Sequence, residues 1–273
     1  MRYIVLLCVS FFILEAKSHM HNTYKQSKTK VYTEVSYEKY QSAIEIFIAI
    51  LKNPSLNMYK FSKELSSLGL EVLKFKNGFF CILDKTNKGG GFYIINETST
   101  SGSMLSAPHR FHDFKTGSIS YKLMIKGNYK AAAFNTVHRK IMDAAHTQVT
   151  LFNAFHIAFS RTYPQEAIYQ LHGFSNKKRS TLAGQEADII ISNGSRYTNK
   201  RMQIIQKCLI KTDKKVALYG KNIFELGGTK NIQYKTLSQE SYRNFVHIEL
   251  NLYTRKEIVS QAELIENIIG CLP

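Results

Sequence analysis

From residue 103 onward, short apolar runs alternate with longer amphipathic segments, and this alternation limits the folds open to the chain. The apolar runs hold four to six residues each, the usual length of strands buried inside a sheet. The expected strands are 104–107, 130–134, 167–171, 187–192, 215–219 and 245–250. The expected helices are 142–161, 199–211 and 256–269. The pattern predicts an α/β fold of three layers, with a central mixed sheet flanked by helices.

Residues 19–101 follow a different pattern and are expected to form an N-terminal α+β extension to a catalytic region at 102–273. A polar lead-in precedes two amphipathic segments and three short β-type runs. The expected helices are 37–51 and 58–68, and the expected strands are 70–75, 79–83 and 91–95. Asn77-Gly78 and Gly89-Gly90 separate the three runs, which favours a hairpin or meander.

Residues 1–18 have the composition of a secretory signal peptide. Arg2 precedes an apolar run over 4–14, and Ala16 and Ser18 stand at the small-residue positions of a cleavage site. An uncleaved amphipathic anchor is the alternative, because the run is short for a bilayer. No later stretch is long and apolar enough for a membrane helix. We therefore expect a secreted or periplasmic protein with no stable membrane span after cleavage.

Cleavage would remove one of the four cysteines and leave Cys81, Cys208 and Cys271. Their wide spacing matches no zinc motif, and at most one disulfide can form within a monomer. Buried apolar thiols are the favoured interpretation.

The positive charge is concentrated in the middle of the chain. The full sequence has a net charge of +17, and residues 102–212 hold 16 basic and 5 acidic residues, a net of +11. Six of the nine histidines lie in the same segment. Such a field attracts anions. No helix-turn-helix, zinc finger or RNA-recognition motif is present, so no nucleic-acid partner is expected, and a solubility surface is the plain alternative.

Polar side chains follow several of the expected strands, and the carboxyl ends of strands are where α/β sheets gather functional groups. His109 and Asp113, four residues apart, would share a face of a helical turn. His172 comes after an apolar strand and before Gly173, which would let the chain turn. Histidine and carboxylate are common zinc ligands, so His109, Asp113 and His172 form a candidate zinc site. A structural, hydrogen-bonded histidine is the alternative for each one taken singly.

Glu249 lies in the expected strand 245–250, and strand periodicity does not settle the face to which it points. It is the candidate general base for activating water at the metal, and a salt bridge to a Lys or Arg is the alternative. Arg139 is a candidate for binding a substrate carboxylate, with Asn135 and His138 beside it. Lys177-Lys178-Arg179 is either a solvated charge run or the rim of an anion-binding mouth.

Other histidines keep the ligand set open. His112 or His146 would be able to replace Asp113 as a ligand. Asp143 and His146, three residues apart near the start of the expected helix 142–161, are interpreted first as a pair that orients a metal ligand. A second metal pair and a helix cap are the alternatives.

In the order of these parts the chain resembles the zinc carboxypeptidases and their relatives with the phosphorylase/hydrolase-like fold, including N-formylglutamate amidohydrolases and poly-γ-glutamate hydrolases. Pro108-His109 with Asp113 is similar to their first metal-binding element, and Leu171-His172-Gly173 to their third-ligand strand. Arg139 looks like the substrate-carboxylate arginine, and Ile248-Glu249-Leu250 like the catalytic strand. Position 112, where carboxypeptidases have the acidic ligand, is His, and the acid falls at 113.

The resemblance implies a zinc-dependent hydrolase of peptide or amide bonds, a carboxypeptidase-like metalloprotease or an amidohydrolase. The expected substrates are acidic: peptides, peptidoglycan-derived stem peptides or polyglutamate-type polymers. A secreted, non-enzymatic protein that binds anionic surfaces or polymers through its basic segment is the alternative. A serine or cysteine hydrolase is disfavoured, since no Gly-x-Ser-x-Gly motif is present.

Overall fold

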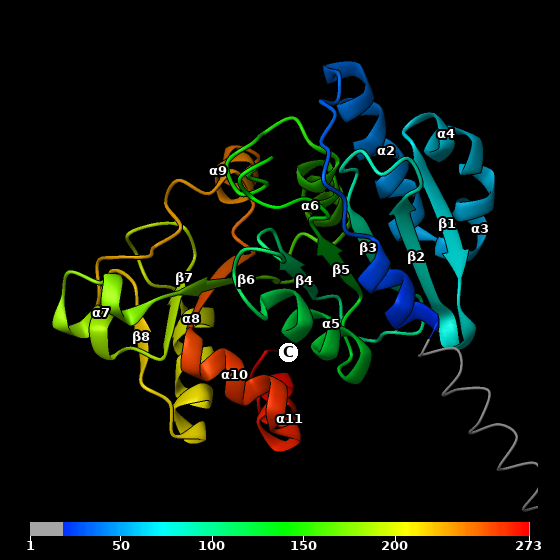
Figure 1. Ribbon diagram of the computed structural model, residues 1–273. Coiled ribbons are helices and arrows are strands. Elements are labelled where there is room, and N and C mark those ends of the chain that lie inside the picture. The colour runs from blue at the N-terminus through cyan, green and yellow to red at the C-terminus, as the bar shows by residue number, and fades with distance from the viewer. Residues whose placement is uncertain (1–18, 273) are drawn as a thin grey trace, which may run out of the picture.

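A sheet of nine strands lies between two layers of helices in the computed structural model, which describes residues 19–272 (Figure 1). This arrangement confirms the predicted α/β fold with a central mixed sheet. The predicted signal peptide, 1–18, lies outside the described residues. Within residues 19–272, no helix combines the length and the apolar character that crossing a membrane requires.

The sheet has the strand order β1-β2-β3-β5-β4-β6-β9-β7-β8. Its strands are β1 (Leu70–Lys74), β2 (Phe79–Asp84), β3 (Phe92–Asn96), β4 (Met104–Ala107), β5 (Ala131–Phe134), β6 (Ile168–Phe174), β7 (Ile189–Ser192), β8 (Val216–Leu218) and β9 (Phe245–Asn251). Four central neighbours, β5, β4, β6 and β9, run parallel. The strands β1, β2 and β3 join antiparallel on one side, and β7 pairs antiparallel with β9 on the other. The carboxyl ends of the four parallel strands therefore meet at one edge.

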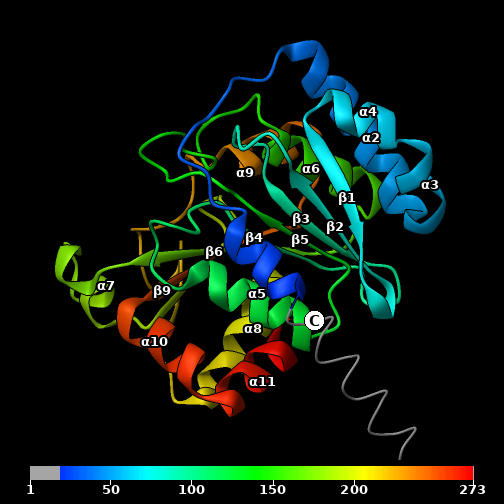
Figure 2. The same cartoon turned by 45° about the vertical axis from the view of Figure 1, so that its right-hand side comes forward.

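Helices cover both faces of the sheet (Figure 2). On one face α5, α8, α10 and α11 lie together, and on the other α2, α6 and α9. Their bounds are α2 (Tyr37–Lys52), α3 (Pro54–Lys60), α4 (Ser62–Ser67), α5 (Thr116–Lys126), α6 (Leu151–Thr162), α7 (Leu182–Glu186), α8 (Lys200–Leu209), α9 (Ile232–Gln239), α10 (Leu252–Ser260) and α11 (Ala262–Cys271). Residues 19–26 are also helical.

Side chains that alternate along the strands form one hydrophobic core on each face of the sheet. In β9, Val246, Ile248 and Leu250 pack on the α5 side, whereas Phe245 packs on the α6 side. The stripe predicted for 37–51 is buried in α2, and this helix packs on α6. His247 and Glu249 share a face with Phe245, so the sheet places polar side chains on that face toward its carboxyl edge.

Several helix predictions differ from the structure. The expected helix 256–269 covers parts of two helices, α10 and α11, and the expected helix 58–68 covers the end of α3 and all of α4. The expected helix 142–161 begins only at Leu151, because Thr150 caps α6 by accepting from the N–H of Asn153, and residues 142–150 form turns. The pattern also missed α5, α7 and α9. In α5 the buried positions include Thr116, Gly117 and Ser120, which weaken the apolar stripe that periodicity detects.

The cysteine prediction holds for one residue and is wrong for two. Cys81 is a buried free thiol, as expected. Cys208 in α8 and Cys271 in α11 instead form a disulfide across 63 residues of sequence. Because the two helices pack side by side only in the folded chain, their sequence spacing gave no sign of the pairing.

We predict that removing this disulfide lowers stability. Closing a loop of this length is worth roughly 4 kcal/mol in the chain-entropy estimate. The double variant Cys208→Ser with Cys271→Ser should therefore unfold at clearly lower urea concentration than the wild type. Reductant should lower the midpoint of the wild type and leave that of the double variant unchanged. Equal midpoints for all samples would contradict the assignment.

His156 is a buried histidine in α6, remote from solvent. Its Nδ1 lies 2.7 Å from the carbonyl oxygen of Phe152 and its Nε2 lies 2.8 Å from Ser106 Oγ. Burial lowers the pKa of His156 from 6.5 to about 4. The folded state therefore resists a proton that the unfolded chain accepts below about pH 6.5.

A depressed histidine pKa contributes stability that is complete above pH 6.5 and is lost as the pH falls through about 4. The loss amounts to about 3 kcal/mol over this window. We expect His156→Gln to make the free energy of unfolding less dependent on pH between 7 and 4, as measured by urea denaturation. An unchanged pH dependence in the variant would show that His156 is not the group responsible.

Candidate functional site

The predicted metal-binding residues come from two parallel strands that are neighbours in the sheet. His109 and Asp113 lie in the turn after β4, and His172 lies near the carboxyl end of β6. Glu249 stands opposite His172 in the register of β6 and β9. The fold thus brings together side chains that are up to 140 residues apart in the sequence.

The turn after β4 sets the first two side chains. The backbone N–H of Asp113 donates to the carbonyl oxygen of His109, at 2.9 Å, and the N–H of Thr116 donates to that of Asp113, at 3.0 Å. This is the helical turn expected from the four-residue spacing, and it places both side chains on one side. His109 and Asp113 therefore face each other before any metal is considered.

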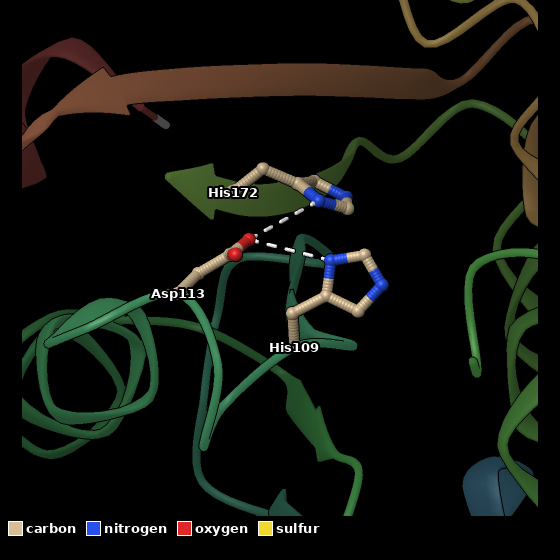
Figure 3. Close-up of side chains that lie close together, drawn as sticks. All are labelled: His109, Asp113 and His172. Atoms are coloured by element: carbon tan, nitrogen blue, oxygen red, sulfur yellow. Dashed lines mark hydrogen bonds and ion pairs between the residues drawn. The ribbon is translucent and has the colours of Figure 1, made fainter. Parts of the chain in front are cut away.

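Asp113 is the centre of the cluster (Figure 3). Its Oδ2 lies 3.3 Å from His109 Nδ1 and 3.6 Å from His172 Nδ1. The same oxygen accepts from the backbone N–H of Gly173 at 3.0 Å. All three side chains are at most 6 % exposed. A carboxylate oxygen and two ring nitrogens thus converge at one buried point.

A chain of hydrogen bonds determines which nitrogen of His172 carries the proton. The backbone N–H groups of Gln233 and Tyr234 donate to Asn231 Oδ1. Asn231 Nδ2 therefore faces Gln170 and donates to Gln170 Oε1 at 2.5 Å. Because that oxygen only accepts, His172 Nε2, 2.8 Å from it, carries the ring proton. Burial lowers the pKa of His172 to about 4, so the neutral ring presents the lone pair of Nδ1 to Asp113.

Asp143 orients His109 in the same way. His109 Nε2 donates to Asp143 Oδ1 at 2.7 Å. Arg139 Nη2 donates to Asp143 Oδ2 at 2.6 Å, and His146 Nδ1 lies 3.1 Å from that oxygen. A carboxylate behind the ring is the usual support of a metal-binding histidine. For Asp143, this geometry agrees with the interpretation as a residue that orients a ligand.

The three ligand atoms fit a zinc ion. A tetrahedral zinc with bonds of about 2.1 Å separates neighbouring ligand atoms by about 3.4 Å. The two separations from Asp113 Oδ2, 3.3 and 3.6 Å, bracket this value, and all three ligand atoms lie within 4.8 Å of one another. Two imidazole nitrogens with one carboxylate oxygen also form a donor set typical of catalytic zinc.

A proton on His109 and the negative charge of Asp113 balance each other within the cluster. Burial opposes a proton on His109, but hydrogen bonds to Asp113 and Asp143 outweigh burial and raise the pKa. Burial likewise opposes ionisation of Asp113, yet the hydrogen bond from His109 holds its pKa well below the usual range. A divalent ion would take the place of the proton on His109 Nδ1, and metal binding should therefore weaken at acid pH.

Glu249 and His247 extend the cluster along β9. The His247 ring stacks on His172 with 4.4 Å between centroids, and His247 Nε2 lies 3.8 Å from Glu249 Oε1. Burial raises the pKa of Glu249 to about 8 and lowers the pKa of His247 well below its usual value. Glu249 forms no ion pair with any Lys or Arg of residues 19–272. The structure therefore does not contain the salt bridge that was the alternative interpretation of Glu249.

Two buried polar atoms of this strand have no hydrogen-bond partner in the described part of the chain. They are Glu249 Oε2 and His247 Nδ1. Buried polar groups are normally paired, so unpaired ones beside the candidate zinc site indicate a place for a ligand. No role of His247 was expected from the sequence. Its spacing of two from Glu249 was the available signal, because residues two apart in a strand share a face.

Among the predicted substrate-binding residues, Asn135 lies deepest. It is 1 % exposed, and its Nδ2 donates to the carbonyl oxygens of Pro108 and Val137. Its Oδ1 accepts from the N–H of Val137. The side chain therefore ties the turn after β4 to the loop after β5. This leaves its amide bonded to backbone rather than presented to a ligand.

Arg139 and His138 lie at the rim of the cluster. Arg139 is 32 % exposed, and one end of its guanidinium is bound to Asp143. His138 is half-buried, and its ring meets that of the exposed His112 edge to face at 5.2 Å. His112 is exposed, and His146, which is also exposed, lies against Asp143. Neither ring takes the place of Asp113 in the cluster.

Gly173 does not turn the chain, contrary to expectation. β6 continues through it to Phe174. Glycine is needed at position 173 because of a close contact and not because of a turn. A Cβ at this position would lie 2.6 Å from the guanidinium carbon of Arg255, so only glycine lets the arginine approach.

No protein-family model matches the sequence, and no curated protein matches it. Several solved structures resemble the chain, and three of them are enzymes or enzyme-family proteins with the following similarities. An N-formylglutamate amidohydrolase from Ralstonia eutropha has a TM-score of 0.49 and 11% identity, covering 67% of this chain and 96% of its own. An aspartoacylase family protein from Mesorhizobium loti has a TM-score of 0.43 and 9% identity, covering 75% and 70%. A succinylglutamate desuccinylase from Vibrio parahaemolyticus has a TM-score of 0.45 and 11% identity, covering 78% and 80%. Since all three TM-scores are below 0.5, the case for a site depends on its own side chains.

We predict that Asp143→Asn weakens zinc binding by about 10- to 100-fold, the usual effect of losing a carboxylate behind a ligand histidine. Asparagine retains the size of the side chain but no longer fixes the tautomer of His109. Competition with a chromogenic chelator at pH 7.5 would measure the affinity. Asp213→Asn, a change in an exposed carboxylate before β8, serves as the control. Equal affinities for both variants would argue against this role of Asp143.

Proposed function

We propose that the protein is a zinc-dependent hydrolase that cleaves an amide bond in an acidic substrate. One observation carries the proposal. The Nδ1 atoms of His109 and His172 both face Asp113 Oδ2, while their opposite nitrogens are held by Asp143 and Gln170. A zinc ion held by His109, Asp113 and His172 supplies Lewis acidity toward a carbonyl oxygen and toward water.

Glu249 is the proposed general base. It lies opposite His172 in the sheet, and its Oε2 is buried without a hydrogen-bond partner among residues 19–272. Its pKa of about 8 is raised by burial and by the nearby charge of Asp113, so the carboxyl group can hold a proton near neutral pH. A group that takes a proton from water and gives it to a leaving amine needs such a pKa.

An acidic substrate is supported by the charges around the cluster. Arg139 is partly exposed at the rim, and Lys177 and Lys178 are exposed in the loop after β6. Arg179 of the same loop instead lies 3.6 Å from Glu225. These cations fit the proposed substrate classes, which are acidic peptides, peptidoglycan-derived peptides and polyglutamate-type chains. His138 and Arg139 are the proposed substrate-binding side chains at this rim.

A secreted or periplasmic location accompanies the proposal. The Cys208–Cys271 disulfide supports it, because structural disulfides persist in oxidising compartments. The predicted signal peptide at 1–18 supports it from the sequence.

The first experiment measures metal. We expect the purified wild-type chain to hold one zinc per molecule by mass spectrometry of the element, and His172→Ala to lose it. Glu249→Gln should retain zinc, since its carboxyl group is not among the three proposed ligands. On a panel of N-acyl acidic amino acids and γ-glutamyl peptides, Glu249→Gln should lower kcat by about 100- to 10,000-fold.

Glu240→Gln is the matched control, because Glu240 pairs with Arg161 outside the cluster. It should keep both zinc and activity. A wild-type protein without stoichiometric zinc would overturn the proposal. Full turnover by Glu249→Gln would overturn the role of Glu249 while leaving the metal site standing. Salt-dependent binding to anionic polymers without turnover or zinc would favour the non-enzymatic alternative.

A further inference from the structure

Arg255 is a buried cation in α10 that lies among the segments of the zinc cluster. It is 5 % exposed. Its Nη1 donates to the carbonyl oxygen of Phe114 at 2.6 Å, and its Nη2 donates to that of Phe174 at 3.1 Å. Its Nε donates to the carbonyl oxygen of Asn251 at 3.2 Å. A single planar group therefore joins three different parts of the backbone.

Each of the three carbonyl groups lies close in sequence to a residue of the site. Phe114 directly follows Asp113. Phe174 is two residues after His172, and Asn251 is two residues after Glu249. We propose that Arg255 is a positioning residue, which fixes the spacing of Asp113, His172 and Glu249 by holding the backbone beside each of them. This inference rests on the proposed zinc site.

Gly173 makes the arrangement possible. A Cβ there would lie 2.6 Å from Arg255 Cζ and Nη1, so any larger residue would displace the guanidinium. The N–H of Gly173 also donates to Asp113 Oδ2. The backbone N–H of Gly173 thus bonds the Asp113 carboxylate. Because glycine has no side chain, it also leaves room for the guanidinium of Arg255.

The surroundings of Arg255 are unusual for a residue that only stabilises the fold. No carboxylate within residues 19–272 forms an ion pair with it. Burying a cation is costly, and apolar side chains fill such space at least as well. The planar fork offers several donors in a fixed geometry, which is what holding three separate carbonyl groups requires. The need to hold three carbonyl groups near the cluster explains an arginine at position 255 better than a contribution to fold stability does.

The test measures zinc affinity by chelator competition together with the unfolding temperature of the metal-free protein. Arg255→Ala should weaken zinc binding by about 10- to 100-fold, the usual effect of losing support behind metal ligands. Arg161→Ala is the matched control, because Arg161 lies near the C-terminal end of α6, where it forms ion pairs with Glu240 and Glu45 and contacts none of the proposed zinc ligands. It should lower the unfolding temperature and leave the zinc affinity within about twofold of wild type.

Chemical rescue separates positioning from general stability. Methylguanidinium at millimolar concentration should restore zinc affinity to Arg255→Ala, whereas methylammonium should not, because only the planar cation bonds several carbonyl groups. Gly173→Ala provides a second variant. It should weaken zinc binding by itself and add little to Arg255→Ala, since both changes act by removing the same guanidinium.

The outcomes distinguish the two proposals. A wild-type protein without zinc would overturn the proposed function and this inference with it. Zinc binding by the wild type with equal affinity in Arg255→Ala would overturn the inference alone. Should Arg255→Ala not fold, Gly173→Ala and Arg255→Lys decide, and wild-type affinity in both would overturn it. Full additivity of the two changes would also count against a shared cause.

Discussion

The rest of the site depends on the contacts that the carboxylate of Asp113 makes. Its Oδ2 faces the ring nitrogens of His109 and His172 and accepts the N–H of Gly173, so it joins the β4 turn to β6. Such a buried group is stable only while its partners remain in place. The partners are in turn held from behind, by Asp143 on one side and by Gln170 on the other. The order of the site thus extends outward to backbone amides at the start of α9.

Most of the sheet was predictable because its strands are short, apolar and bounded by turn residues. All six strands expected beyond residue 103 exist, with ends that shift by at most three residues. Helices were harder to predict. α5 has small and hydroxyl side chains on its buried face, and the false start at 142 arises because apolar residues of a packed turn imitate a helical stripe. Tertiary packing, which periodicity does not register, decides both cases.

The residues of the site were predictable to different degrees for a physical reason. His109, Asp113 and His172 share a local signal, since each follows or ends an apolar strand. The residues that hold these side chains in place lie far from them in the sequence. Asp143 reaches His109 across 34 residues, and Arg255 reaches Phe114 across 141. Nothing in the spacing of a sequence encodes such distances, and the same holds for the disulfide between Cys208 and Cys271. Polar residues at strand ends are thus visible in a sequence. Asp143 was also expected to orient a ligand, but the histidine that it holds, and the supporting contacts of Gln170 and Arg255, become visible only in the fold.

The two outer strands of the sheet have a consequence for association. An unpaired strand edge offers backbone groups to any other chain, and natural sheets oppose this with short strands or charged side chains. β8 has only three residues, and β1 carries the exposed Glu71 and Lys74. The two ends of the sheet thus discourage strand addition by different means. The sheet can stop at nine strands within one chain, without a second copy to continue it.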